Sequence, residues 1–168
     1  MILLHLRYSN QMALPSLTEY GLLPDGIHDC SMADVETLFA STGSSQRCRE
    51  LFGRLGEFLQ ELRLAGWASE VIIDGSFVMS VVGQSNDLDL VLVLPKDWDL
   101  RAEVRPFEYD LISSRRARRR FGFDVFAVPS ASVAERNWIT FFSGVGRKWV
   151  HELSLSPGTR KGLLRVRP

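Results

Sequence analysis

Apolar side chains recur every three or four residues between positions 46 and 65, and charged side chains fill most positions between them. This spacing predicts an amphipathic helix over 46–65, and Gly66 is a typical residue to end it. Less regular patterns predict helices over 106–120 and 132–142. A short helix from 32 to about 40 is also expected, because Ser31 and Asp34 have the spacing of a capping box at its start.

Other stretches have the pattern of β-strands. Residues 87–94 alternate two aspartates and two valines with four leucines, so one face of the strand is wholly leucine. The other face becomes apolar after Asp89, which predicts a central strand covered on both faces. Residues 71–73 and 123–128 predict two more strands, and 160–167 predicts an edge strand with basic side chains facing outward.

These elements predict an α/β (α+β) fold class, with a small mixed β-sheet flanked by helices. The chain has 168 residues, which is enough for one domain with a sizeable core. We expect a single domain over 31–168. An extended lead-in over 1–30 precedes it, with two prolines and two glycines between 13 and 29. Met12 is an alternative start, which would make 1–11 a dispensable leader.

Composition and charge exclude several classes of protein. The chain is 45% hydrophobic and 24% charged, as is ordinary for a globular protein, and its formal net charge is +0. Any nucleic-acid binding must therefore come from a local basic patch. Cys30 and Cys48 stand apart and predict reduced thiols in a cytoplasmic protein. The apolar run at 1–6 is too short for a signal peptide or a membrane span.

The most informative chemistry lies at the start of the strand predicted over 87–94. Asp87 and Asp89 point to the same face of a strand, so their repulsion is costly unless a cation lies between them. Magnesium is usually held by one or two carboxylates together with substrate phosphates. Gly75 and Ser76 follow a short apolar strand, and we expect Ser76 to cap a helix over 77–82 whose N-terminus binds phosphate.

A third carboxylate, Asp124, lies in the strand predicted over 123–128. A charge in an apolar strand is costly unless it is paired or binds a metal. One alternative is an ion pair with an arginine from the cluster just before it. The other is a metal-binding or catalytic role, because a strand that follows a crossover helix would place Asp124 beside the strand 87–94. Three acids at one sheet edge permit two-metal chemistry.

These motifs together resemble the nucleotidyltransferase superfamily of DNA polymerase beta type. The resemblance rests on Gly75-Ser76, ten residues, Asp87-Leu88-Asp89 and then Asp124. Within the superfamily the chain is most similar to minimal bacterial nucleotidyltransferases, and to an uncharacterised branch with some relatives that look like toxin–antitoxin components.

The resemblance spans residues 20–168 and implies a nucleotidyltransferase fold, Mg²⁺ or Mn²⁺, and transfer of a nucleoside monophosphate from a nucleoside triphosphate such as ATP. It implies that Gly75 and Ser76 hold phosphate. It further implies that Asp87 and Asp89 bind metal and that Asp124 completes the site.

One segment departs from that family. Minimal members carry a polar, glycine-containing turn soon after the Gly-Ser pair, whereas 77–82 is apolar here. A basic residue for the triphosphate must then come from elsewhere, and the arginine-rich segment 115–120 is the first candidate. Arg115, Arg118 and Arg119 share one helical face and are expected to bind phosphate of a nucleotide or a polynucleotide. The alternative is a solvated helix end. Further basic candidates are Arg147, Lys148, Arg160 and Lys161.

Two kinds of function follow from these motifs. The first is a metal-dependent nucleotidyltransferase whose acceptor is a hydroxyl of RNA, for example tRNA, or of a protein. The second is a catalytically inactive nucleotidyltransferase-like binding module, such as a toxin–antitoxin component or another protein-partner component. With no second domain to bind an acceptor, we expect a protein partner, a homodimer, or a small acceptor cleft formed by the C-terminal helix and tail.

Overall fold

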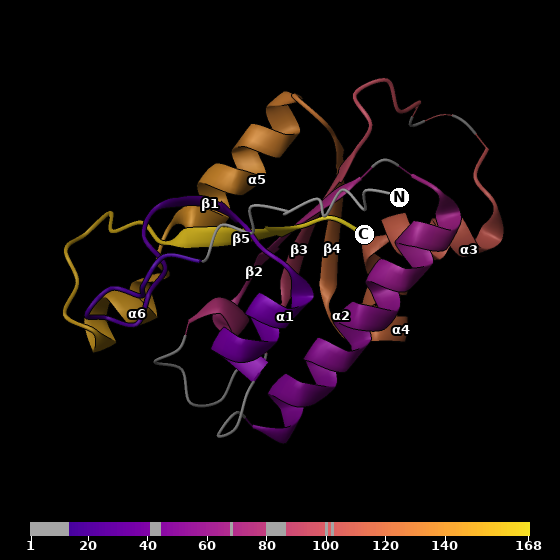
Figure 1. The fold of residues 1–168 in the computed structure, drawn as a ribbon. Coiled ribbons are helices and arrows are strands. Elements are labelled where there is room, and N and C mark those ends of the chain that lie inside the picture. Colours follow the sequence, from indigo (N-terminus) through magenta and orange to yellow (C-terminus); the bar gives the residue numbers. More distant parts are fainter. Residues whose placement is uncertain (1–13, 41–44, 68, 80–86, 100, 102) are drawn as a thin grey trace, which may run out of the picture.

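The computed structural model describes residues 14–40, 45–67, 69–79, 87–99, 101 and 103–168. It is built on one five-stranded sheet (Figure 1). The strands are β1 (Gly26–Asp29), β2 (Glu70–Asp74), β3 (Asp89–Leu94), β4 (Asp124–Pro129) and β5 (Gly162–Val166). The expected leader over 1–11 lies outside the described residues.

The strands follow the order β1-β5-β2-β3-β4 across the sheet. β1 pairs with β5, and β3 with β4, in parallel, whereas β2 is antiparallel to both β3 and β5. The predicted mixed sheet and α/β class are thus confirmed. The prediction of an edge strand near the chain end is wrong, because β5 lies between β1 and β2. The edge position is taken by β1, from the segment expected to be an extended lead-in.

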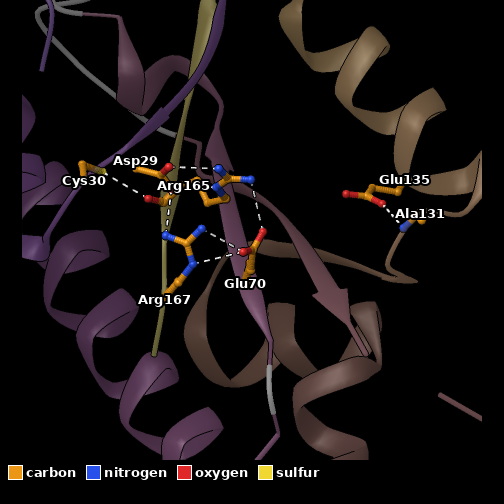
Figure 2. A network of polar contacts seen from close by, with 7 residues as sticks. All are labelled: Asp29, Cys30, Glu70, Ala131, Glu135, Arg165 and Arg167. Atoms are coloured by element: carbon orange, nitrogen blue, oxygen red, sulfur yellow. Dashed lines mark hydrogen bonds and ion pairs between the residues drawn. The ribbon is translucent and has the colours of Figure 1, made fainter. Parts of the chain in front are cut away.

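Charged side chains on both neighbours explain why the basic strand β5 lies inside the sheet. Arg165 donates to Asp29 of β1 at 2.7 Å and to Glu70 of β2 at 3.3 Å. Arg167 donates to Glu70 at 3.0 Å and to Asp29 at 2.9 Å (Figure 2). The hydrogen bond from Arg165 is the main cause that holds the pKa of Asp29 below its usual range. These bonds join three strands at the sheet end where β5 finishes.

The helices are α1 (Met32–Val35), α2 (Gln46–Ala65), α3 (Pro106–Ile112), α4 (Ser114–Phe121), α5 (Val133–Ser143) and α6 (Arg147–Glu152). α2 has the predicted bounds, and Gly66 ends it in the left-handed conformation. The capping box before α1 is also confirmed, with Ser31 and Asp34 bonded to each other's backbone. α1 continues as a π-helix, Glu36–Ala40. None of the described helices is long and apolar enough to cross a membrane.

Three local predictions were wrong. The single helix expected over 106–120 is two helices, because Ser113 between them has an extended backbone with ψ 109°. The glycines and proline of the segment 144–159 predict a loop-rich region, but this segment contains α6. The helix expected over 77–82 begins as a single 3-10 turn, Ser76–Val78, followed by extended backbone at Met79. The rest of that segment lies outside the described residues.

The two faces of the sheet are covered by different helices (Figure 1). The leucine face of β3 packs with buried residues of α2 and α4, and the valine face packs with α5. On the α2 side, Phe58 makes edge contacts with Phe121 and Phe123 at 5.3 and 5.5 Å between ring centroids. The central position predicted for β3 is confirmed, since it is buried from Leu90 to Leu94.

Candidate functional site

Three carboxylates stand side by side at one end of the sheet. Asp74 ends β2 and is the register partner of Asp89, which begins β3. Asp89 is in turn the register partner of Asp124, which begins β4. Register partners carry their side chains on the same face of a sheet, so the three acids form a row on the face covered by α5. The predicted closeness of Asp89 and Asp124 is confirmed. Asp74 was not expected to belong to the site.

A fourth carboxylate, Asp87, lies just before β3 and is exposed. Its Oδ1 accepts a hydrogen bond from the backbone N–H of Ser76 at 3.1 Å and another from the Ser76 hydroxyl. Ser76 was expected to cap a helix. Instead the N-cap position belongs to Gly75, which makes no side-chain cap hydrogen bond. The Gly-Ser turn is therefore tied directly to the first acid of the Asp-x-Asp motif.

Gly75 is required where it stands. Its φ is 93°, in the region that favours glycine, and a Cβ there would lie 2.8 Å from the backbone oxygen of Asp87. Any other residue would strain the turn and push Asp87 away. The close approach of the two segments explains why a glycine precedes the serine of this motif.

A buried lysine neutralises one end of the acidic row. Lys161, just before β5, is 4% exposed and forms an ion pair with Asp74, which is 6% exposed. The same ammonium donates to the carbonyl of Phe142 at 2.9 Å. Burial raises the pKa of Asp74, although Lys161 opposes that shift. Lys161 thus joins β2, β5 and the end of α5 beneath the site.

The row carries more negative charge than this lysine offsets. Burial, followed by the charges of Asp87, Asp74 and Asp124, raises the pKa of Asp89 to about 6. A carboxylate in that environment is stabilised when a cation approaches. The local electrostatics therefore favour binding of a cation at Asp89.

The third predicted acid has a partner of its own. Asp124 forms an ion pair with Arg118 of α4 at 3.2 Å, which is the arginine pairing that the sequence left open as an alternative. The Arg118 side chain is 71% exposed, so the pair is accessible to water. Such an exposed pair contributes at most about 1 kcal/mol. Asp124 therefore remains close to Asp89 without being held firmly by the arginine.

An open pocket of about 450 Å³ lies over Asp74 and Asp89 of the acidic row, and Asp124 does not line it. Its walls combine Asp74, Gly75, Ser76, Asp87, Asp89 and Lys161 with residues 141–149 of α5, α6 and their connection. Arg147 and Trp149 of α6 line it, and so does Phe141, whose side chain is 68% exposed. Phe141 and Trp149 were not expected to belong to the site. Arg147 was a secondary basic candidate from the sequence.

The first basic candidates lie elsewhere. Arg115 and Arg119 are exposed on α4 and do not line this pocket, and Arg118 reaches the row only through Asp124. The arginine that lines the pocket thus comes from α6. The sequence could not show this, because α6 is six residues long and carries no clear period.

The acids suit a magnesium ion that also takes ligands from water and from substrate phosphates. Within the described part of the chain, no group of three or more His, Cys, Asp or Glu side chains is arranged to hold a metal ion. Asp87 and Asp89 offer two carboxylates, and magnesium commonly takes one or two carboxylates with waters and substrate phosphates. The donor set therefore suits an ion that arrives with a triphosphate.

Comparisons with known proteins gave one match. Residues 15–167 match the model of a family of unknown function, DUF6932. No curated protein and no solved structure matches the chain.

Proposed function

The chain belongs to the DUF6932 family of unknown function, and we propose that it is a metal-dependent nucleotidyltransferase. It would move a nucleoside monophosphate from a triphosphate to a hydroxyl of RNA or protein. The observation that carries the proposal is the acidic row on β2, β3 and β4, joined to a Gly-Ser turn through the hydrogen bonds between Ser76 and Asp87. Neighbouring acids without full charge compensation are costly, and a bound cation with phosphate would offset that cost.

The pocket over the row offers the contacts that a nucleotide needs. Its volume of about 450 Å³ lies within the usual range for small-molecule sites. Arg147 supplies a cation for phosphate oxygens, and the exposed ring of Phe141 supplies a flat apolar surface for a base. The Ser76 hydroxyl and N–H are donors at the other wall, and they now bond to Asp87.

Asp87 and Asp89 would hold the metal ion, which when bound would polarise the phosphate oxygens and favour the ionised form of the attacking hydroxyl. The acceptor oxygen would form a bond to the α-phosphorus while the bond between that phosphorus and the bridging oxygen breaks, so pyrophosphate leaves. The proton of the hydroxyl would pass to Asp124, beside Asp89 in the sheet. The weak pair between Arg118 and Asp124 leaves this carboxylate available.

A second candidate is an inactive binding module that docks on a protein partner, as in a toxin–antitoxin pair, or on a second copy of itself. It is favoured by the internal bonds at the acids, since Ser76 bonds to Asp87, Arg118 to Asp124 and Lys161 to Asp74. Three of the four carboxylates are thus satisfied without any ligand. The remaining carboxylate, Asp89, has no such side-chain partner within the described part of the chain. This difference favours the enzyme.

The deciding experiment is transfer of label from each of four α-labelled nucleoside triphosphates, with Mg²⁺ or Mn²⁺, to total tRNA or to the proteins of a lysate. The wild type is compared with D87N/D89N and with the control D97N/E103Q, which removes two exposed acids outside the site. Labelling that D87N/D89N loses and the control keeps would support the enzyme. Equal labelling by both variants, or none by the wild type, would refute it for these acceptors.

A further inference from the structure

A basic surface on α3 and α4 lies beside the acidic row but outside its pocket. It consists of Tyr109, Arg115, Arg116, Arg118, Arg119 and Arg120, and we call it the α3–α4 surface. We propose that this surface binds a single-stranded polynucleotide and that the end of the bound strand is the acceptor of the proposed transfer. The acceptor role of the strand end rests on the proposed function, whereas binding of the polynucleotide does not.

Two arginines on this surface are available for anions from outside. Arg115 and Arg119 are exposed and make no ion pair with any described residue. They are four residues apart in one helix, so their side chains lie on the same face about one turn apart. The other three arginines have acidic partners in the fold: Arg116 with Asp110 at 3.0 Å, Arg118 with Asp124 at 3.2 Å, and Arg120 with Glu61. The net positive charge of this surface thus resides in Arg115 and Arg119.

An exposed aromatic ring accompanies these cations. Tyr109 is 47% exposed, and the guanidinium of Arg116 lies 5.3 Å from its ring centroid. Arg116, Arg119 and Arg120 also line a hollow of about 270 Å³ with Asp110. Basic grooves that carry exposed aromatic side chains are the usual design for single-stranded nucleic acids, because phosphates contact the cations and bases stack on the rings. An acidic polypeptide would use the cations but would have no base to stack on Tyr109.

The α3–α4 surface joins the site through one residue. Arg118 lies on α4 and reaches around the start of β4 to Asp124. A strand bound along α4 and in contact with Arg118 would therefore reach Asp124 of the acidic row. A phosphate of that strand competes with Asp124 for Arg118. Binding of the acceptor would thus displace Asp124 from Arg118 at the edge of the acidic row, next to the site of the proposed transfer.

Binding is tested by fluorescence anisotropy with labelled 12-nucleotide RNA and DNA strands of mixed sequence, at several salt concentrations, with labelled polyglutamate as the acidic polypeptide. The full chain is compared with R115Q/R119Q and with Y109A. The matched control is K96Q/R136Q, which removes the same charge from exposed positions at the other end of β3 and β4. If each arginine contacts one phosphate, R115Q/R119Q lowers the salt slope by about 1.4 and weakens binding about 25-fold at 0.1 M salt. Y109A weakens binding about fivefold or more.

Salt-dependent binding that R115Q/R119Q loses and K96Q/R136Q keeps would support the proposal, and the preferred probe would identify RNA or DNA as the source. Absence of binding to both strands, equal loss in the control, or equal affinity for polyglutamate would overturn it. Stabilisation of the chain by Mg²⁺ and a nucleoside triphosphate, measured as a thermal shift, is recorded separately. This thermal shift and its loss in D87N/D89N test the nucleotide site of the proposed transfer. The anisotropy measurements test the α3–α4 surface, so each proposal can fail independently of the other.

Discussion

The environment of Asp89 makes a quantitative prediction about stability. Its pKa is raised from an ordinary 3.8 to about 6 by burial and by the three neighbouring carboxylates. The folded chain then holds a proton at pH 5 that the unfolded chain has released. The contribution of Asp89 to stability therefore falls as the pH rises from about 4 to about 7, because this carboxyl binds more protons in the folded state across that window.

The variant D89N should remove the loss of stability that Asp89 causes at higher pH, since an amide has nearly the same shape as a carboxylate and no charge. A shift of about two pKa units corresponds to about 3 kcal/mol at pH 7.5, and partial exposure of the carboxyl reduces the expected gain to about 1–3 kcal/mol. The gain should shrink toward zero near pH 4, where the wild-type carboxyl is protonated in the folded state.

The measurement is the free energy of unfolding in urea with EDTA at pH 4.5, 5.5, 6.5 and 7.5. D97N serves as the control, because Asp97 is an exposed acid in the turn after β3. Adding Mg²⁺ should narrow the difference between wild type and D89N at pH 7.5. A variant that is less stable than the wild type at pH 7.5, or a gain that does not change with pH, would refute the charge argument.

Three further predictions concern other parts of the site. K161M leaves the Asp74 carboxylate buried without its partner and should lower the free energy of unfolding in urea by about 3–5 kcal/mol. Adding D74N should recover most of this stability, and a cost below about 1 kcal/mol for K161M would contradict the ion pair. G75A places a Cβ 2.8 Å from the Asp87 carbonyl oxygen at φ 93°, so at least about 2 kcal/mol should be lost, and an unchanged melting temperature would contradict the strained turn. F141A should change stability by less than about 0.5 kcal/mol, because the side chain is 68% exposed, yet reduce the thermal shift by Mg²⁺ and nucleotide; an unchanged shift would remove Phe141 from the nucleotide contacts.

The parts of the fold that were predictable are those set by local pattern. α2 has the expected bounds because an amphipathic period sustained over its whole length leaves few alternative registers. The parallel pairing that brings Asp89 beside Asp124 follows from the crossover between β3 and β4. Both depend on neighbouring stretches of chain.

The parts that were not predictable depend on contacts distant in sequence. The alternation of Arg165 and Arg167 predicts outward-facing residues of an edge strand. Only their bonds to Asp29 of β1 and Glu70 of β2 explain why the strand lies inside the sheet. Lys161 is 87 residues from Asp74, so no local signal marks them as a pair. Six-residue α6, which brings Arg147 to the pocket, is too short to show a period.

The position of β5 has a consequence for how the protein is made. Pairing of Asp29 with Arg165 closes a loop of 136 residues, and contacts of such long range form slowly in folding chains. While a ribosome is still making the segment before Lys161, β1 and β2 have no strand between them and Asp74 has no ammonium beside it. The nascent chain therefore carries an acidic row whose charge is uncompensated by Lys161.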